Sequence, residues 1–127
     1  MIKEEDTLSK EIIGAAIEVH RNLGPGLLES AYEECLCRES AICGIAFERQ
    51  KPLAVSYKGV KLDYGYRLDI VVGGLIILEL KAVDQIEPIH EAQLLTYLKL
   101  SNLKLGILIN FNVPILRDGI KRIVNGL

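Results

Sequence analysis

The sequence Asp69-Ile-Val-Val-Gly-Gly-Leu-Ile-Ile-Leu-Glu79-Leu-Lys81 places three charged residues within two runs of apolar ones. Gly73-Gly74 predicts a hairpin that folds the first run back alongside the second. Glu79 and Lys81 are two residues apart, so in a strand both side chains project from one face while the intervening apolar residues fill the other. Charge in a buried strand needs a partner, so this stretch is a candidate functional site.

The length of the turn decides whether the side chains of Asp69 and Glu79 lie on the same face of the hairpin. A two-residue loop sets Asp69 opposite Leu78 and leaves Glu79 on the other face of the hairpin. A three-residue loop at residues 73–75, or an equivalent bulge, sets Asp69 directly opposite Glu79. Two carboxylates and an ammonium gathered on one face make a divalent-cation site, so we predict the odd loop.

Length and composition indicate a single domain over residues 1–127. The chain is 50% hydrophobic, which suffices for one sizeable core. It has no apolar run of 18 or more residues, and its polar, acidic N-terminus does not resemble a signal peptide. We therefore expect a cytoplasmic protein without a membrane partner. The three cysteines, which lie close together and have no fourth ligand nearby, are expected to be reduced thiols.

The net charge of −2 hides an uneven distribution. Residues 1–48 carry ten acidic and four basic side chains, whereas residues 49–127 carry seven acidic and eleven basic ones. The second part is therefore the better surface for a polyanion, although this charge alone does not indicate a nucleic-acid binder.

Hydrophobic periodicity predicts two helices before the hairpin. The first has apolar residues at steps of three and four, a cap at Asp6 or Thr7, and its end at Gly24-Pro25-Gly26. The second spans about residues 27–41, with Glu33 among the residues expected to be solvated.

The remaining segments alternate between strands and one further helix. Short strands over residues 45–63 indicate an antiparallel meander that leads into the hairpin. A third helix runs over about residues 89–100, followed by a buried strand at 103–111 and a tail at 115–124 for which we favour a strand. These elements predict an α/β fold: a single domain with a mixed central β-sheet flanked by helices, in the core order α-β-β-β-α-β.

Side chains on two of the helices complete the set of candidates. Glu29 lies in the first turn of the second helix, where the helix dipole stabilises a carboxylate. It is three residues from Tyr32 and shares its face, so we expect it to point inward. On the third helix, Gln93 and Tyr97 fall on one line at a spacing of four.

In combination these residues resemble the PD-(D/E)XK nuclease superfamily. Within it, the small GxxExxY proteins have a name motif that matches Gly26-Leu-Leu-Glu29-Ser-Ala-Tyr32. The other matching segments are Gly24-Pro25-Gly26, Arg67-Leu-Asp69, Glu79-Leu-Lys81, Gln93-x-x-x-Tyr97 and Gly106-Ile-Leu-Ile-Asn-Phe111. The resemblance covers nearly the whole chain and implies a restriction-endonuclease-like fold.

The resemblance also implies a role for each residue. Asp69 and Glu79 correspond to carboxylates that bind Mg²⁺ or Mn²⁺, with the backbone carbonyl of Leu80 as an extra ligand and Glu29 as an additional acid. Lys81 is similar to the lysine that orients or deprotonates the attacking water and stabilises charge on phosphorus. Such a cation prefers hard oxygen ligands and keeps several waters, so the implied chemistry is coherent.

The expected function is a metal-dependent nuclease that hydrolyses phosphodiester bonds of DNA or RNA, with weak sequence preference and a homodimer if both strands of a duplex are cut. Gln93 and Tyr97 correspond to a supporting helix motif. One alternative is a non-catalytic nucleic-acid or protein interaction module, in which the charged trio forms a buried ion-pair network. Another is a metal-dependent enzyme for a small nucleotide-derived phosphodiester.

Overall fold

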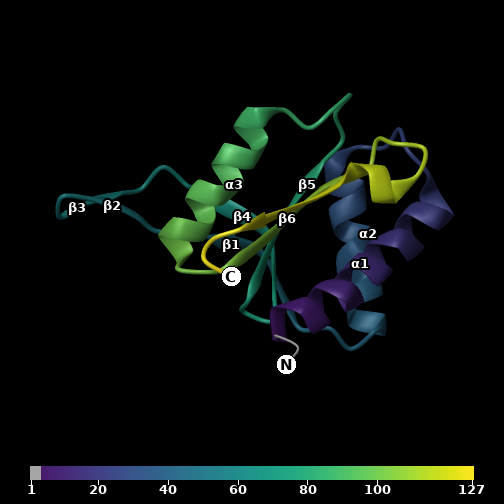
Figure 1. Ribbon diagram of the computed structural model, residues 1–127, viewed down its shortest axis with the longest axis horizontal. Helices are drawn as coiled ribbons and strands as arrows, with labels where there is room; N and C mark the ends of the chain where they lie inside the picture. Colours follow the sequence, from purple (N-terminus) through teal and green to yellow (C-terminus); the bar gives the residue numbers. More distant parts are fainter. Residues whose placement is uncertain (1–3) are drawn as a thin grey trace.

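The structure, a computed structural model, describes residues 4–127 and consists of three helices on the two faces of one five-stranded sheet (Figure 1). In chain order the elements are α1 (Glu4–Leu23), α2 (Glu29–Ile42), β1 (Phe47–Pro52), β2 (Val55–Tyr57), β3 (Val60–Leu62), β4 (Arg67–Val72), β5 (Ile76–Lys81), α3 (Pro88–Ser101), β6 (Leu105–Asn110), the 3₁₀ helix η1 (Leu116–Gly119) and β7 (Ile120–Val124). The predicted single α/β domain with a mixed sheet is confirmed. No helix within residues 4–127 is long and apolar enough to span a membrane.

The sheet has the strand order β1-β4-β5-β6-β7, in which only β5 and β6 run parallel. Helices α1 and α2 cover one face, and α3 covers the other (Figure 1). The core is therefore double. On the first face the stacked rings of Tyr32 and Phe111, 4.4 Å apart, are fully buried. On the second face Leu94 and Leu98 of α3 pack against Ile77 of β5.

The expected meander is wrong in one respect. β1 pairs directly with β4, from Phe47 opposite Val72 to Pro52 opposite Arg67, so β2 and β3 form a separate two-stranded sheet. This hairpin projects from the rest of the domain (Figure 1). Its strands have three residues each and are largely exposed, and its one apolar face, formed by Val55, Tyr57, Val60 and Leu62, stays outside the main sheet.

The turn between β4 and β5 contains three residues, as predicted. Val72 pairs with Ile76, and the intervening Gly73 and Gly74 have φ angles of +58° and +69° that favour glycine. The register that follows places Asp69 in line with Glu79, although the paired ladder ends one position earlier, at Ile70 with Leu78.

Helix boundaries agree with the sequence at one end of α1 and not at the other. Gly24, with a φ of +70°, follows the last residue of the helix. The predicted cap at Asp6 or Thr7 is wrong, because both residues lie inside α1. Glu4, Glu5 and Asp6 form an acidic first turn, which the helix dipole stabilises. The tail strand is confirmed for β7 only, since η1 precedes it.

Helix α3 lies close to the sheet because residue 106 of β6 is glycine. A Cβ atom at Gly106 would lie 2.8 Å from Cγ of Leu94, closer than carbon atoms approach one another in proteins. The missing side chain thus sets how near α3, and every residue on its inner face, comes to the strands beneath.

Candidate active site

Asp69 and Glu79 lie on the sheet face that α3 covers. Glu79 alternates with Ile77, which packs against α3, and it is only 6% exposed. Asp69 is half-buried and lies two residues before Val71, which belongs to the same α3-side cluster. The odd turn therefore brings the two carboxylates to one face, as the sequence predicts.

The carboxylate of Asp69 is fixed by the backbone of the neighbouring strand. Beyond the last ladder pair, the Leu80 N–H donates to Oδ2 of Asp69 at 2.8 Å instead of to a strand carbonyl. A side-chain oxygen has taken the place of main-chain pairing at this point. The Asp69 carboxylate is consequently oriented by β5 and does not depend on its own rotamer preference.

Glu79 carries a buried oxygen without a partner. Its Oε1 is inaccessible to solvent and accepts no hydrogen bond from any of residues 4–127. Burial, followed by the neighbouring carboxylate of Asp69, raises the pKa of Glu79 to about 9, while Lys81 acts in the opposite direction. In its ionised form this carboxylate needs a cation, because Asp69 adds charge of the same sign.

Lys81 ends β5 on the same face and is half-buried. Its Nζ forms no ion pair within 4 Å with any carboxylate of residues 4–127. A closed network of Asp69, Glu79 and Lys81 is therefore absent from this part of the chain. The ammonium therefore acts on the charge of Glu79 without forming a direct ion pair with it.

Tyr97 brings α3 to the two carboxylates. Burial, followed by the charge of Glu79, raises the pKa of its hydroxyl, with smaller contributions from Tyr66 and Asp69. Gln93, one turn earlier, is exposed and lines a cavity of about 230 Å³ together with Tyr66 and Tyr97. The spacing of four thus puts both predicted helix residues on the side of α3 that faces the site.

Glu29 is placed differently from the expectation. It is the first residue of α2 and is exposed, so the predicted inward orientation is wrong. Tyr32, one turn later, is buried, and its hydroxyl donates to the Gly24 carbonyl (2.6 Å) and accepts from the Leu27 N–H (3.1 Å). Tyr32 therefore holds the loop before α2. The chain from residue 4 onward contains no cluster of three acidic, histidine or cysteine ligands, so the role of Glu29 as an additional acid stays a prediction.

A residue that the sequence did not single out holds the chain after β5. Asn110 pairs with Lys81 across the parallel strands, and its amide group donates to the Val83 carbonyl (2.9 Å) and accepts from the Val83 N–H (3.1 Å). It is 2% exposed. The available signal was an amide at the end of an otherwise apolar strand.

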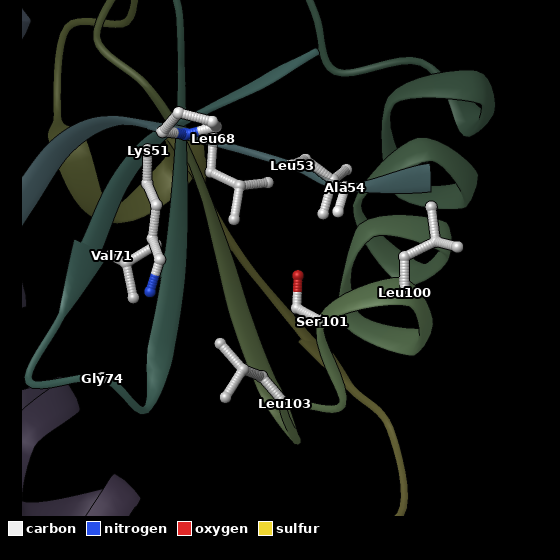
Figure 2. Close-up of a pocket in the computed structure, with 10 residues that line it drawn as sticks. Lys51, Leu53, Ala54, Leu68, Val71, Gly74, Leu100, Ser101 and Leu103 are labelled. Atoms are coloured by element: carbon white, nitrogen blue, oxygen red, sulfur yellow. The ribbon is translucent and has the colours of Figure 1, made fainter. Parts of the chain in front are cut away.

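A second cavity, of about 250 Å³, lies between β4 and the end of α3 (Figure 2). Leu68 and Val71 of β4 line it together with Ser101 at the end of α3. Gly74, which precedes β5, also borders it, whereas Lys81 ends that strand. None of the six predicted site residues lines this cavity, although Leu53 and Leu100 border both it and the 230 Å³ cavity.

The fold and these residues define an α/β domain with two carboxylates and a lysine at the end of a central hairpin. Residues 6–123 match the family model of the PD-(D/E)XK nuclease superfamily. The chain belongs to this superfamily, whose members typically use a divalent metal ion. No curated protein and no solved structure matches the chain significantly.

Proposed function

We propose that this protein is a metal-dependent nuclease that hydrolyses phosphodiester bonds of DNA or RNA at Asp69, Glu79 and Lys81. The observation that carries the proposal is the buried, unpartnered Oε1 of Glu79 beside a second carboxylate. A structural ion pair satisfies its oxygens internally, whereas this arrangement leaves negative charge for a ligand to neutralise.

The residues fit a hard divalent cation. Mg²⁺ is commonly bound through one or two carboxylates and keeps several waters, so Asp69 and Glu79 suffice as side-chain ligands. The Leu80 carbonyl and Glu29 are further proposed ligands. When bound, the ion supplies Lewis acidity and acidifies a coordinated water.

The other side chains support the reaction by charge and position. Lys81 places a fixed ammonium where negative charge develops on phosphorus, and it is free of competing ion pairs within residues 4–127. Asn110 fixes the chain directly after Lys81 and so limits where that ammonium lies. Gln93 and Tyr97, which line one cavity along α3, are proposed to orient groups at the site.

Membership of the GxxExxY proteins, the cytoplasmic location and the homodimer stay predictions. So does the weak sequence preference.

The test is cleavage of single- and double-stranded DNA and RNA in Mg²⁺ or Mn²⁺. Replacing Glu79 with Gln, or Lys81 with Met, is expected to lower the cleavage rate by about 10²–10³-fold, the effect of losing one preorganised charge-stabilising group. Lys99→Met, an exposed lysine on α3, is the matched control and keeps full activity. Equal cleavage by wild type, Glu79→Gln and Lys81→Met would refute the proposal. Binding without cleavage would favour the non-catalytic module.

A further inference from the structure

The projecting hairpin concentrates exposed aromatic side chains. We call residues 53–66, which contain β2 and β3, the hairpin arm. Three of the five tyrosines of the chain lie in it, and Tyr57, Tyr64 and Tyr66 are 63%, 74% and 46% exposed. Aromatic rings of this size are normally buried, so three exposed rings within ten residues indicate a binding surface.

The arm and the strand residues at its base account for the basic character of the second part of the chain. Residues 49–67 carry five basic side chains and one acidic one, whereas residues 68–127 carry six of each. Arg49 and Lys51 form ion pairs with acidic neighbours. Lys58, Lys61 and Arg67 form no such pair with any carboxylate of residues 4–127. Two of these basic groups lie in the arm: Lys58 in its turn, next to Tyr57, and Lys61 on the face opposite Tyr57.

The arm has a defined conformation. Lys58 and Gly59 both have positive φ angles, 48° and 82°, as the tight turn of a two-residue hairpin requires. The Leu53 N–H donates to the Tyr66 carbonyl at 2.9 Å and closes the base of the arm. Nζ of Lys58 lies 5.3 Å from the centre of the Tyr57 ring. A ligand therefore meets a formed surface and does not have to order a flexible loop.

The base of the arm adjoins the candidate active site. The arm leaves the sheet between Pro52 of β1 and Arg67 of β4, two residues before Asp69 (Figure 1). The rings of Tyr64 and Tyr66 are 6.4 Å apart at an angle of 58°. Tyr66 in turn lines the 230 Å³ cavity with Gln93 and Tyr97. Aromatic side chains therefore continue from the arm to the carboxylates.

We propose that the hairpin arm binds a single-stranded segment of polynucleotide and leads it to the active site. Unpaired bases stack on Tyr57 and Tyr64, Lys58 and Lys61 contact phosphates, and the strand passes Tyr66 toward Asp69 and Glu79. This inference rests on the proposed nuclease function and names its substrate class.

Two features favour a single strand over a duplex. Stacking on exposed rings requires bases whose faces are free, which a continuous duplex does not offer. Duplex binding draws its affinity from many phosphate contacts, about 6–10 in well-studied cases, and the arm has two basic groups without an ion pair among residues 4–127. The net charge of −2 adds no further attraction.

The inference is tested by fluorescence anisotropy with the full chain in EDTA, so that binding is measured without turnover. The probes are 20-nucleotide single strands of DNA and RNA, a 20-base-pair duplex, and an abasic strand of equal length and charge. At least one of the two single strands is expected to bind about tenfold more tightly than the duplex and the abasic strand. Comparing DNA with RNA identifies which sugar is preferred.

Variants separate stacking from charge. Tyr57→Ala with Tyr64→Ala is expected to weaken single-strand binding by tenfold or more, whereas Tyr57→Phe with Tyr64→Phe keeps the rings and the affinity. Both positions are exposed, so unchanged thermal melting verifies the fold. Lys58→Ala with Lys61→Ala is expected to lower the slope of log affinity against log salt by about 1.4, because each phosphate contact contributes about 0.7.

Several results would overturn the inference: equal affinity for duplex or abasic strands, no effect of the alanine pair, or no binding to any polynucleotide. Glu79→Gln is expected to bind the single strand as wild type does. Cleavage of duplex alone would refute the inference and leave the nuclease proposal intact. Single-strand binding with cleavage insensitive to Glu79→Gln would refute the nuclease proposal at this site instead.

Discussion

Two buried glutamates of this protein occupy opposite chemical situations. Glu33 of α2 is 8% exposed, and its two oxygens accept from Arg49 Nε and Gln50 Nε2, each at 2.7 Å. Glu79 is 6% exposed, yet its Oε1 accepts no hydrogen bond from residues 4–127. Its charged neighbours include a second carboxylate, that of Asp69. The two side chains are therefore buried to nearly the same extent. The supply of donors, and not the depth, distinguishes the structural acid from the candidate ligand.

The comparison predicts opposite effects on stability, of which the loss of Glu33 is the larger. Glu33→Ala removes two hydrogen bonds to a charged acceptor and is expected to lower the free energy of unfolding by about 3 kcal/mol. This value is at the low end for two such bonds, because Arg49 is partly exposed and keeps Glu34 as a partner. Urea denaturation measures the change.

Glu34 provides the matched control for that experiment. It also binds Arg49 at 2.7 Å, but its side chain is 71% exposed. Glu34→Ala is expected to change the free energy of unfolding by less than about 1 kcal/mol, as for other exposed ion pairs. Equal losses in the Glu33 and Glu34 variants would show that burial of Glu33 adds nothing.

Replacing the ionisable carboxyl of Glu79 with an amide is expected to stabilise the metal-free protein. Its pKa rises from 4.5 to about 9 on folding, so the penalty for keeping this acid is absent below pH 4.5 and grows as the pH rises toward 9. At pH 7 it amounts to about 3 kcal/mol, since each pH unit adds about 1.4 kcal/mol. Glu79→Gln should recover about 2 kcal/mol of this, because the buried amide still needs partners.

The pH dependence checks the sign of that effect. In EDTA the advantage of Glu79→Gln over wild type should increase from pH 5 to pH 8, measured by urea denaturation at each pH. A constant difference between wild type and Glu79→Gln across this range would contradict the raised pKa.

A divalent cation is expected to offset part of the stability penalty of Glu79. A ligand that binds only the folded state at ten times its Kd stabilises it by about 1.4 kcal/mol. Mn²⁺ titrated against thermal unfolding should therefore raise the Tm of wild type with concentration, and leave Glu79→Gln nearly unchanged. A similar rise in both proteins would place the ion elsewhere.

The sequence predicted the β4–β5 hairpin well because its information is local. Alternation within 76–81 fixes which side chains share a face, and the Gly73-Gly74 pair fixes where the chain reverses. The choice of an odd loop came from the chemistry of Asp69 and Glu79 and is confirmed by the register. The roles of Asp69 and Glu79 as metal ligands stay predictions.

Contacts between distant segments were not predictable in the same way. Glu33 was expected to be solvated, since nothing near it on the helix indicates burial, yet its donors come from β1, 16 and 17 residues later. Likewise, the periodicity of α2 placed Glu29 inward with Tyr32, although the loop contacts of Tyr32 leave Glu29 outside. The pairing of β1 with β4 depends on a similar long-range choice.

The close packing of Leu94 on Gly106 makes the geometry of the site depend on two residues that do not belong to it. Gln93 adjoins Leu94 in sequence and Tyr97 lies one turn beyond, so any side chain at position 106 would lift both away from Glu79. The two positions must therefore vary together: a larger residue in the strand is compatible only with a smaller one in the helix. A substitution that changes the packing of the core at this contact therefore also changes where Gln93 and Tyr97 lie relative to the carboxylates.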